Sequence, residues 1–457
     1  MRTRSLSLST CAALVALSAT PAAGAQAGLR KGPWLMDPRA TEITVMVERE
    51  TSGPVTVSAV PESGADATVA GAVSVESAAL IALHEVTLRG LRPGTRYRYT
   101  VTGPSIEEAE GRFATAPEGE GFVPFRFVVY GDTRSRASAH RAVINALVSE
   151  GAEWAMHTGD LLDDGRDEEQ WQGFFEIERA LLRSTPMIPV IGNHEIARPG
   201  SSGVDLYRRY VRCAPSAASP QPELHYTFAW GNVHAVLVNG YDDFTDERTA
   251  GWLEAQLAAA RAAADRGRGW VLFVSHWGPR SSGPHGENRP FLRGNIADLL
   301  RRHRVDLSIA GHDHLYERGD DQGLRYLVSG GGGSPLYRRR FEREYARTLV
   351  SAHHYVRVDV ESDRLLVSAL APDGALIERC GLRHTGWDCD GPTRTPQAPS
   401  AQGSISPGPS AVNDAVQRNC SCRVPVGSMP HRAEIARWGA LACALWVGRR
   451  RRETARS

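Results

Sequence analysis

The sequence predicts a multidomain protein in which an all-β sandwich precedes an α/β domain. The chain has 457 residues, which is more than a single hydrophobic core usually serves. Between residues 31 and 115, short alternating runs are separated by Gly, Pro and Ser turns, and no helical period is sustained. After Pro117 the pattern changes to apolar strands that alternate with helices. We therefore expect the sandwich in residues 28–116 and the α/β domain in residues 117–390.

The amino-terminal residues have the order of a secretory signal peptide. Arg2 and Arg4 precede a mainly apolar run, which is followed by Pro21 and small residues. We expect residues 1–27 to be removed and the mature protein to be extracytoplasmic, either secreted or held at the cell surface. A helix of the mature fold is the alternative interpretation.

Two further segments follow the α/β domain. Residues 391–418 are rich in Pro, Ser, Gly, Gln and Ala, which predicts a disordered linker. Residues 419–457 combine a Cys-Ser-Cys pair, a short apolar run and four consecutive arginines, an arrangement that resembles the carboxyl-terminal sorting tags of some bacterial surface proteins. The apolar run is shorter than the roughly 20 residues that cross a bilayer. If the apolar run extends over its weakly polar neighbours, we expect it to attach the protein to the cell surface or the membrane. A degraded tag is the second alternative, and a partial metal site at the cysteines is the third.

Outside its two ends the chain is acidic. Residues 28–418 hold 43 basic and 50 acidic side chains, a net charge of −7. Such a body lacks the basic face that binds a phosphate backbone, so nucleic acid is excluded as a partner. Cys380 and Cys389 are close enough to pair in an oxidising compartment, although free thiols remain the alternative, and Cys213 has no evident partner.

One segment of the first domain indicates its type. The run from Leu91 to Tyr99 reads Leu-Arg-Pro-Gly-Thr-Arg-Tyr-Arg-Tyr and resembles the corner of a fibronectin type III domain, in which a Leu packs inward and a Tyr bonds back to the turn. Tyr97 is the expected corner residue. The first domain is therefore interpreted as fibronectin type III-like, with a generic hairpin as the alternative.

The elements of the α/β domain follow its apolar pattern. Strands are expected at 125–130, 154–158, 187–191, 233–239, 270–275, 305–310, 324–329 and 355–360. Helices are expected at 139–148, 168–182, 249–264 and 296–303.

Five of these strands end in residue types that bind metals. The residues are Asp132, Asp160, Asn193 with His194, His276, and His312 with His314. Ligands gather at the carboxyl ends of strands in α/β sheets, so we expect these side chains to lie close together. Carboxylate, amide and imidazole groups suit a pair of divalent metal ions, and a carboxylate can bridge two ions. A Gly precedes most of these residues, which permits a tight turn from strand to loop.

The order of these motifs is more specific than any one of them. The pattern Asp, Gly-Asp, Gly-Asn-His-Glu, His and Gly-His-Asp-His resembles the calcineurin-like metallophosphoesterase superfamily, and with a sandwich ahead of it the chain is similar to purple acid phosphatases. The resemblance covers about residues 30–385. It implies a four-layer α/β/β/α sandwich and two divalent or trivalent metal ions, with iron, zinc and manganese as candidates.

The resemblance also implies a role for each matching residue. One metal would be held by Asp132, Asp160 and His314, and the other by Asp160, Asn193, His276 and His312, with Asp160 as the bridge. His194 would face the phosphoryl group and either stabilise its charge or protonate the leaving oxygen. His285 lies nine positions after His276 and is a second candidate for this work, with an exposed loop histidine as the alternative.

Two departures from the family pattern concern the first metal. The superfamily's Asp-x-His is Asp132-Thr133-Arg134 here, and the Gly-Asp-x-x-Tyr of purple acid phosphatases ends in Asp163 instead of Tyr. A purple ferric site is not expected without that tyrosinate. Asp163 could supply an oxygen to the same metal, and His140 could replace the missing nitrogen. Arg134 cannot bind a metal, but its planar fork suits a phosphate oxygen, with a surface arginine as the alternative.

The resemblance thus implies a secreted dinuclear-metal phosphoesterase that hydrolyses phosphomonoesters through attack of a metal-bound hydroxide on phosphorus. A phosphodiesterase on the same scaffold is the first alternative. The second alternative is a degenerate, non-catalytic surface-binding protein, which Arg134 and Asp163 would favour. The physiological substrate, the metals and the oligomeric state stay open.

Overall fold

The computed structural model describes residues 28–62, 82–118, 122–196, 203–213 and 219–389. The predicted signal peptide, linker and carboxyl-terminal tail lie outside these residues. Among the described helices, none combines the length and the apolar composition of a membrane span.

The first domain is built of strands alone within the described residues. These are β1 (Leu29–Met36), β2 (Glu42–Arg49), β3 (Thr56–Pro61), β4 (Leu83–Arg89), β5 (Arg96–Thr102) and β6 (Ala109–Ala114). They form two antiparallel sheets, β1-β2-β4 and β3-β5-β6. Val45 and Val86 of one sheet share a buried cluster with Tyr99 and Val101 of the other. The expected β-rich amino-terminal region is therefore confirmed for the described residues.

The corner before β5 has the expected bond. The Tyr97 hydroxyl accepts a hydrogen bond from the Arg92 amide at 2.8 Å, and Leu91 is buried in the cluster between the two sheets. A buried hydroxyl needs such a partner, so the bond fixes the turn against its own strand.

The second domain contains two seven-stranded sheets. The strands that lead to the site are β7 (Phe125–Tyr130), β8 (Trp154–His157), β9 (Met187–Pro189), β12 (Trp270–Ser275) and β13 (Leu307–Ala310). The others are β10 (Tyr226–Trp230), β11 (Val233–Val238), β14 (Tyr316–Asp321), β15 (Leu324–Ser329), β16 (Ala346–Val350), β17 (Tyr355–Val360), β18 (Leu365–Leu370), β19 (Leu376–Arg383) and β20 (Gly386–Cys389).

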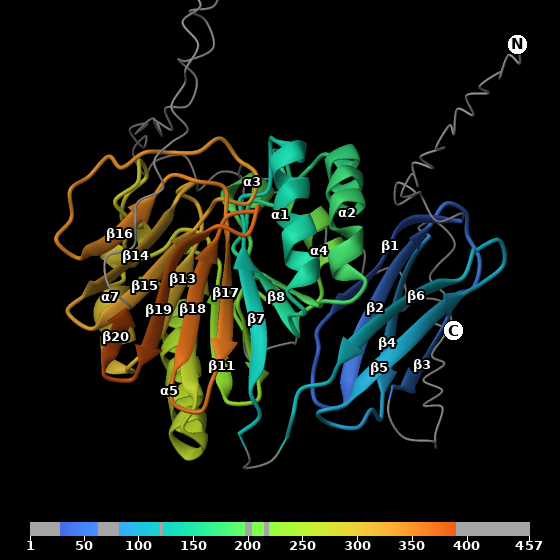
Figure 1. Cartoon of the computed structure of the whole chain (residues 1–457), viewed down its shortest axis with the longest axis horizontal. Coiled ribbons are helices and arrows are strands. Elements are labelled where there is room, and N and C mark those ends of the chain that lie inside the picture. Colours follow the sequence, from blue (N-terminus) through green and yellow to red (C-terminus); the bar gives the residue numbers. More distant parts are fainter. Residues whose placement is uncertain (1–27, 63–81, 119–121, 197–202, 214–218, 390–457) are drawn as a thin grey trace, which may run out of the picture. The chain divides into compact units, whose positions relative to one another are not determined.

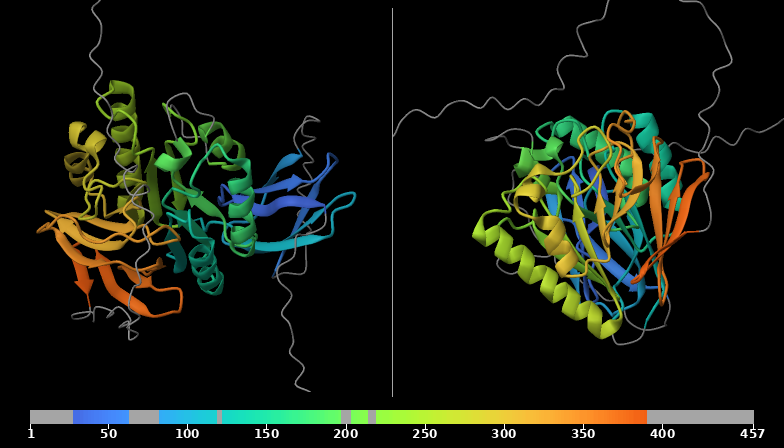
Figure 2. Two further views of the ribbon diagram at one scale, coloured as in Figure 1. Left: turned by 90° about the horizontal axis from the view of Figure 1, so that it is seen from above. Right: turned by 90° about the vertical axis from the view of Figure 1, so that its left-hand side faces the viewer.

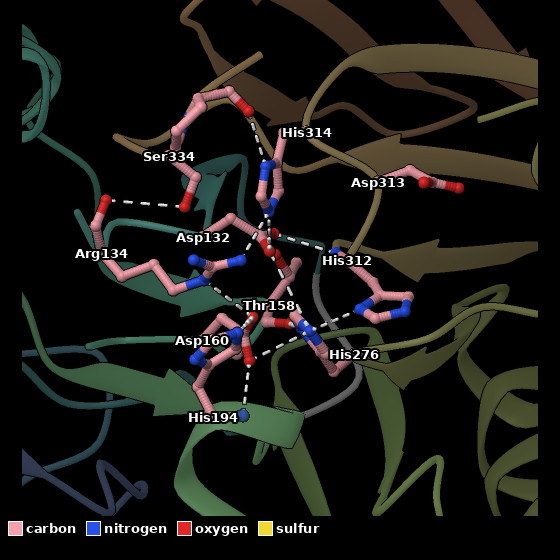
Figure 3. A network of polar contacts seen from close by, with 12 residues as sticks. Asp132, Arg134, Thr158, Asp160, His194, His276, His312, Asp313, His314 and Ser334 are labelled. Carbon is pink, nitrogen blue, oxygen red and sulfur yellow. Dashed lines mark hydrogen bonds and ion pairs between the residues drawn. The ribbon is translucent and has the colours of Figure 1, made fainter. Parts of the chain in front are cut away.

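Each sheet joins a parallel part to antiparallel strands. One has the order β10-β11-β12-β13-β15-β14-β16, and its central four strands are parallel. The other has the order β20-β19-β18-β17-β7-β8-β9, in which β7, β8 and β9 are parallel. The parallel parts direct the carboxyl ends of strands from both sheets toward the site, which is shown in Figure 3.

The helices lie on the outer faces of the sheets, with one exception. They are α1 (Ala137–Ser149), α2 (Glu168–Leu182), α3 (Asn193–Ile196), α4 (Gly203–Tyr210), α5 (Glu247–Gly267), α6 (Arg289–Arg293) and α7 (Ile296–Arg302). The exception is α3, which belongs to the loop after β9 and begins at Asn193. Asp167 caps α2 by accepting hydrogen bonds from the amides of Glu169 and Gln170, which explains why this helix begins where the sequence predicts.

Alternating residues of the central strands pack in different layers. Val129 of β7 and Leu272 of β12 belong to the cluster between the two sheets. The neighbouring Val128 packs with residues of α1 and α2, and Val271 packs with residues of α5 and α7. Figure 1 shows α1 and α2 beside β7 and β8, and Figure 2 shows α5 along the outer side of the domain. The domain therefore has the order helix, sheet, sheet, helix.

A disulfide joins the last two strands. Cys380 of β19 and Cys389 of β20 are opposite each other in the antiparallel pair and are bonded. Cys213 is a free thiol. The pairing predicted as one alternative from the sequence is thus the one that the structure contains.

Candidate metal centre

The carboxyl ends of five strands meet at one cluster of ligand atoms. Asp132 follows β7, Asp160 follows β8, Asn193 follows β9, His276 follows β12, and His312 follows β13. Figure 3 shows these side chains, apart from the unlabelled Asn193, converging on the same space. The convergence expected at the strand ends is therefore observed.

Two groups in this cluster have the composition of metal sites. One consists of Asp160, His276 and His312, and the other of Asp132, Asp160 and His314. Within each group, one ligand atom from every residue lies within 4.8 Å of the others. Asp160 belongs to both groups, which places its carboxylate where a bridge between two cations would be.

The carboxylate of Asp132 indicates that a cation is expected here. Its Oδ2 accepts a hydrogen bond from the His312 amide at 3.0 Å. Its Oδ1 is buried and accepts no hydrogen bond. The nearest histidine nitrogen is His314 Nε2 at 3.5 Å, which is too far for a good hydrogen bond, and a metal ion at this position would compensate the charge of the carboxylate.

The histidine rings are oriented by backbone carbonyls. The Nδ1 atoms of His276 and His314 lie 2.7 Å from the carbonyl oxygens of Thr158 and Pro335, respectively. Donation from Nδ1 leaves the Nε2 lone pair of each ring directed at the carboxylates, where His276 Nε2 is 3.2 Å from Asp160 Oδ1. This is the usual arrangement of metal-binding histidines in proteins.

The electrostatics of the cluster also favour a cation. Burial opposes protonation of His276, but the carboxylates of Asp160 and Asp132 outweigh it and raise its pKa to about 9. Burial likewise opposes ionisation of Asp160, and its pKa is nevertheless held well below the ordinary value by His276, His194 and Arg134. The Asp160 carboxylate is thus kept anionic, as ligation requires.

The sequence predicts that the Gly before each ligand makes the tight turn possible, but in most of these turns the ligand itself has the left-handed backbone conformation. Asp132, Asp160 and His312 themselves have φ angles of 56°, 52° and 69°. Of the glycines before them only Gly159 has a positive φ. Gly192 is required for space instead, because a Cβ there would lie 2.2 Å from Asp160 Oδ1. The loops are therefore close-packed, and the left-handed strain is carried by the ligands.

Residues 125–316 match the family model of the calcineurin-like phosphoesterases. The chain carries a calcineurin-like phosphoesterase domain. Purple acid phosphatase 21 of Arabidopsis thaliana is 27% identical over 266 residues, which are 55% of this chain and 58% of that protein. The uncharacterized protein Rv2577 of Mycobacterium tuberculosis is 27% identical over 273 residues, which are 52% of this chain and 51% of that protein. The chain thus spans between half and two thirds of the length of these relatives.

Two solved structures are similar to the chain in fold. The purple acid phosphatase PPD1 of yellow lupin seeds has a TM-score of 0.63 and 19% identity, covering 75% of this chain and 72% of that one. The structure of PhoD has a TM-score of 0.61 and 12% identity, covering 83% of this chain and 95% of that one. At these identities the likeness establishes the fold of the phosphoesterase domain.

Glu195 organises the loops of the phosphoesterase domain, a role that the sequence did not reveal. Its buried carboxylate accepts hydrogen bonds from the amides of Gly192, Asp160 and Leu161 at 2.8 to 3.1 Å. Burial and the charge of Asp160 raise its pKa to about 7, against the opposing charge of His276 and the hydrogen bonds from the Gly192 and Leu162 amides. Glu195 therefore ties the loop after β9 to the loop after β8.

Tyr241 is a second residue that sequence reasoning missed. Its hydroxyl donates to Asn193 Oδ1 at 2.9 Å and lies 3.3 Å from His312 Nδ1. The amide oxygen of Asn193 is thereby held beside the group that contains His276 and His312. Tyr241 follows β11 and Asn193 follows β9, so their proximity arises only from the packing of the two sheets against each other.

Arg134 lies inside the cluster. Its Nε is 3.2 Å from Asp160 Oδ2, and its NH2 is 3.3 Å from His314 Nε2. Figure 3 shows its side chain between these two residues, and only 14% of the side chain is exposed. Arg134 thus contacts the same atoms that a cation held by Asp132, Asp160 and His314 would require.

His194 and Asp163 lie at the rim of the cluster. His194 Nδ1 is 2.6 Å from the Asp163 carbonyl oxygen, and its Nε2 is 3.7 Å from Asp160 Oδ2. The Asp163 carboxylate pairs with Ser135 and Arg134 and belongs to neither ligand group. The structure therefore places His194 Nε2 toward the carboxylates, and it places the Asp163 carboxylate at the Arg134 guanidinium.

His285 faces the cluster and is held by a residue that the sequence did not single out. Its Nδ1 is 2.9 Å from Asp313 Oδ1, and its ring centroid is 4.0 Å from that of His312. Ser281 donates to the other oxygen of Asp313. Donation from Nδ1 to Asp313 leaves Nε2 of His285 available to a ligand at the centre.

His140 is not brought to the metal ligands. It lies on α1 with its Nε2 at 2.7 Å from Glu178 Oε1, and both side chains are buried. Helix α1 directs this ring toward α2, so the nitrogen that could have replaced the missing first-metal ligand is occupied by a carboxylate.

Proposed function

We propose that the chain is a phosphoric ester hydrolase that uses two metal ions and prefers phosphomonoesters. The observation that supports this most is the sharing of Asp160 by two ligand groups at the ends of strands from both sheets. A carboxylate in that position serves a pair of cations, which is the arrangement used for displacement at phosphorus.

In this proposal one cation is held by Asp132, Asp160 and His314, and the other by Asp160, Asn193, His276 and His312. The orphaned Oδ1 of Asp132 and the oriented histidines fit such ions. When bound, the cations neutralise phosphate charge and acidify a water molecule. Iron, zinc and manganese are the candidates, because the ligands mix carboxylate, amide and imidazole groups.

His194 is proposed to move a proton to the leaving oxygen. Its Nδ1 bonds to the carbonyl of Asp163, so Nε2 is the nitrogen that exchanges a proton at the rim of the cluster. The side chain is 27% exposed, which leaves Nε2 accessible to a substrate. His285, oriented by Asp313, is proposed to bind the phosphate from another side.

Arg134 is proposed to contact a phosphate oxygen after it releases the ligands. A cation beside His314 needs the Nε2 lone pair that the guanidinium now contacts, so both cannot hold this nitrogen at once. The released guanidinium remains near the centre and suits a phosphate oxygen through its planar fork.

Arg134→Ala is expected to lower kcat/KM for a monoester by about 10- to 100-fold, the usual effect of losing a charge-assisted hydrogen bond. The loss for a diester should be smaller, since a monoanion offers less charge to the fork. Arg134→Lys should restore part of the loss. Steady-state kinetics with an aryl phosphate and its diester measure the difference, and Arg136→Ala is the neighbouring control. Equal rates for Arg134→Ala and the parent on both substrates would contradict the contact.

Asp313→Asn tests whether Asp313 positions His285. It is expected to lower kcat by about 10- to 100-fold with unchanged metal content, which is the usual cost of losing the partner of a site histidine. Combining it with His285→Ala should cost no more than His285→Ala alone, because the two residues act as one unit. Additive losses would show that Asp313 acts elsewhere. Asp320→Asn, at the far end of β14, is the control.

The alternatives are a phosphodiesterase and a non-catalytic surface-binding protein. Arg134 within the ligand cluster and the Asp163 side chain turned to it are the observations that favour loss of the first metal. Metal analysis of the purified protein, together with hydrolysis of an aryl phosphate and of its diester, separates all three. A protein without metal and without turnover would be the binding protein, and a faster diester reaction would indicate the phosphodiesterase.

The proposed setting is extracytoplasmic, with a fibronectin type III-like first domain. The Cys380–Cys389 disulfide supports an oxidising compartment. The bond from the Arg92 amide to Tyr97 supports the domain type. Secretion through residues 1–27, the linker 391–418 and attachment through residues 419–457 stay proposals from the sequence.

A further inference from the structure

A cavity of about 630 Å³ lies in the phosphoesterase domain away from the metal centre. It is bounded by the ends of α5 and α7, the β14–β15 turn and the β17–β18 turn. These segments lie at the amino-terminal ends of β12 and β13, whereas the metal ligands follow their carboxyl-terminal ends. The six residues of β12 separate the two places by about 20 Å at 3.3 Å per residue.

The lining of this cavity is rich in arginine. It contains Arg261, Arg268, Arg301, Arg304 and Arg325 against three carboxylates, those of Asp265, Asp306 and Asp363. We call this cavity with its five arginines the arginine pocket. Since residues 28–418 as a whole carry a net charge of −7, such a local excess of cationic groups needs an explanation.

The three carboxylates are already committed to partners. Asp306 accepts from Arg261 NH1 at 3.0 Å, from the Val271 amide at 2.8 Å and from His384 Nδ1 at 2.8 Å. Asp265 is shared between Arg261 and Arg304, at 2.9 and 2.5 Å. Asp363 pairs with Arg383, which does not line the cavity. Outside the lining, Asp298 and Asp321 pair with Arg301, and Asp320 lies 3.8 Å from Arg325. Among the five arginines, Arg268 alone therefore has no carboxylate partner in the described residues.

Two of the arginines keep unused donors. Among the described residues, no hydrogen-bond or ion-pair partner is found for the side chain of Arg268. Arg325 Nε is buried without a hydrogen-bond acceptor, and the nearest carboxylate oxygen paired with it, from Asp320, is 3.8 Å away. The buried Arg325 Nε costs free energy while it lacks an acceptor, and the exposed Arg268 guanidinium has no protein partner that an anion would need to displace.

One side of the pocket is firmly built, whereas Arg268 and Arg304 are exposed. Arg261 and Arg325 have only 11% and 14% of their side chains exposed, so their positions are fixed by packing. His384 stacks on Trp270 with a centroid distance of 4.2 Å and is tied to Asp306. Preorganised donors lose little freedom when they bind a ligand.

We propose that the arginine pocket binds a small, multiply charged phosphate-bearing anion. Guanidinium groups bind phosphate through two parallel hydrogen bonds, and several around one cavity suit more than one negative charge. The volume is that of a small-molecule site, which favours a small ligand over a nucleic acid or a folded partner. The source is either free inorganic phosphate or the phosphate of a nucleotide, and this site is independent of the proposed reaction.

Calorimetric titration of the full chain with inorganic phosphate and with a nucleoside monophosphate tests the pocket. The titrations use the Asp160→Asn background, in which binding at the metal centre is weakened. We expect phosphate to bind with a stoichiometry near one, and tighter binding of the nucleotide would identify that source. Citrate binding as tightly as phosphate would overturn the phosphate class, and no binding of either phosphate compound would overturn the site.

Arg268→Asn with Arg304→Asn should then weaken binding about tenfold or more. Both residues have a left-handed backbone, with φ angles of 50°, which Asn tolerates well, so the fold should persist. Arg266→Gln with Arg302→Gln is the matched control, because it removes the same charge from α5 and α7 outside the lining. Equal weakening in the control would overturn the site as a general charge effect. Since all variants share one background, failure of the proposed reaction would leave this comparison intact.

Discussion

Asp160→Asn is expected to remove most of the bound metal and to lower turnover of an aryl phosphate by roughly 10³-fold or more, because a cation pair stabilises the transition state by several kcal/mol. Asp160 is 1% exposed and is the residue common to the two ligand groups. An amide keeps the shape of the side chain but lacks the negative charge that a bridge between two cations requires.

Asp160→Asn removes the negative charge without adding backbone strain. Asp160 has a φ of 52°, and Asn is the residue that tolerates this conformation best apart from Gly, so the loop should keep its path. Inductively coupled plasma mass spectrometry of the purified variant measures the metal, and Asp373→Asn in the exposed turn between β18 and β19 is the control. A variant with the metal content and turnover of the parent would refute the bridging role.

Elements with strong local signals could be predicted from the sequence. Helix α2 spans Glu168–Leu182, and strands β12 and β15 span Trp270–Ser275 and Leu324–Ser329, as expected. The Asp167 cap and the apolar runs of the two strands are properties of neighbouring residues. Strands β14 and β16 could not be predicted in this way, since they are specified by antiparallel pairing with each other and, for β14, with β15.

The ligand groups were predictable because each ligand ends a recognisable strand. The supporting residues were not. Glu195 and Asp313 lie within the quoted motifs, but the donors of the hydrogen bonds that their carboxylates accept lie in loops that follow other strands. Tyr241 carries no motif, and its contact with Asn193 joins residues 48 positions apart.

His140 and Arg134 show the same limit of sequence-based prediction, because their contacts in the structure differ from those that the sequence predicted. The periodicity of α1 does not predict which neighbouring element His140 faces, because its partner Glu178 comes from another helix. Arg134 was expected near the phosphate because it stands two residues after Asp132. The structure places it against Asp160 and His314, where it would compete with a cation, and only the packing of the loops reveals this.

His194→Ala is expected to lower turnover by roughly 10²- to 10⁴-fold, the usual range for a lost general acid, while the metal content stays unchanged. The ring is held through Nδ1 by the Asp163 carbonyl and is absent from both ligand groups, so its removal should not release a cation. An equal loss of metal would instead make His194 a ligand. His303→Ala, at the end of α7, is the control.

The leaving group separates the two roles that His194 could have. If its Nε2 protonates the leaving oxygen, the loss should be large for an alkyl phosphate, whose alkoxide needs the proton, and small for a nitrophenyl phosphate, whose phenolate leaves without it. If the ring only stabilises charge on the phosphoryl group, both substrates should lose turnover by the same factor. His194 Nε2 lies at the rim of the cluster, 3.7 Å from Asp160 Oδ2, and the side chain is partly exposed, so a leaving oxygen can approach it. We therefore expect the alkyl substrate to show the greater loss, and equal factors would assign His194 to charge stabilisation alone.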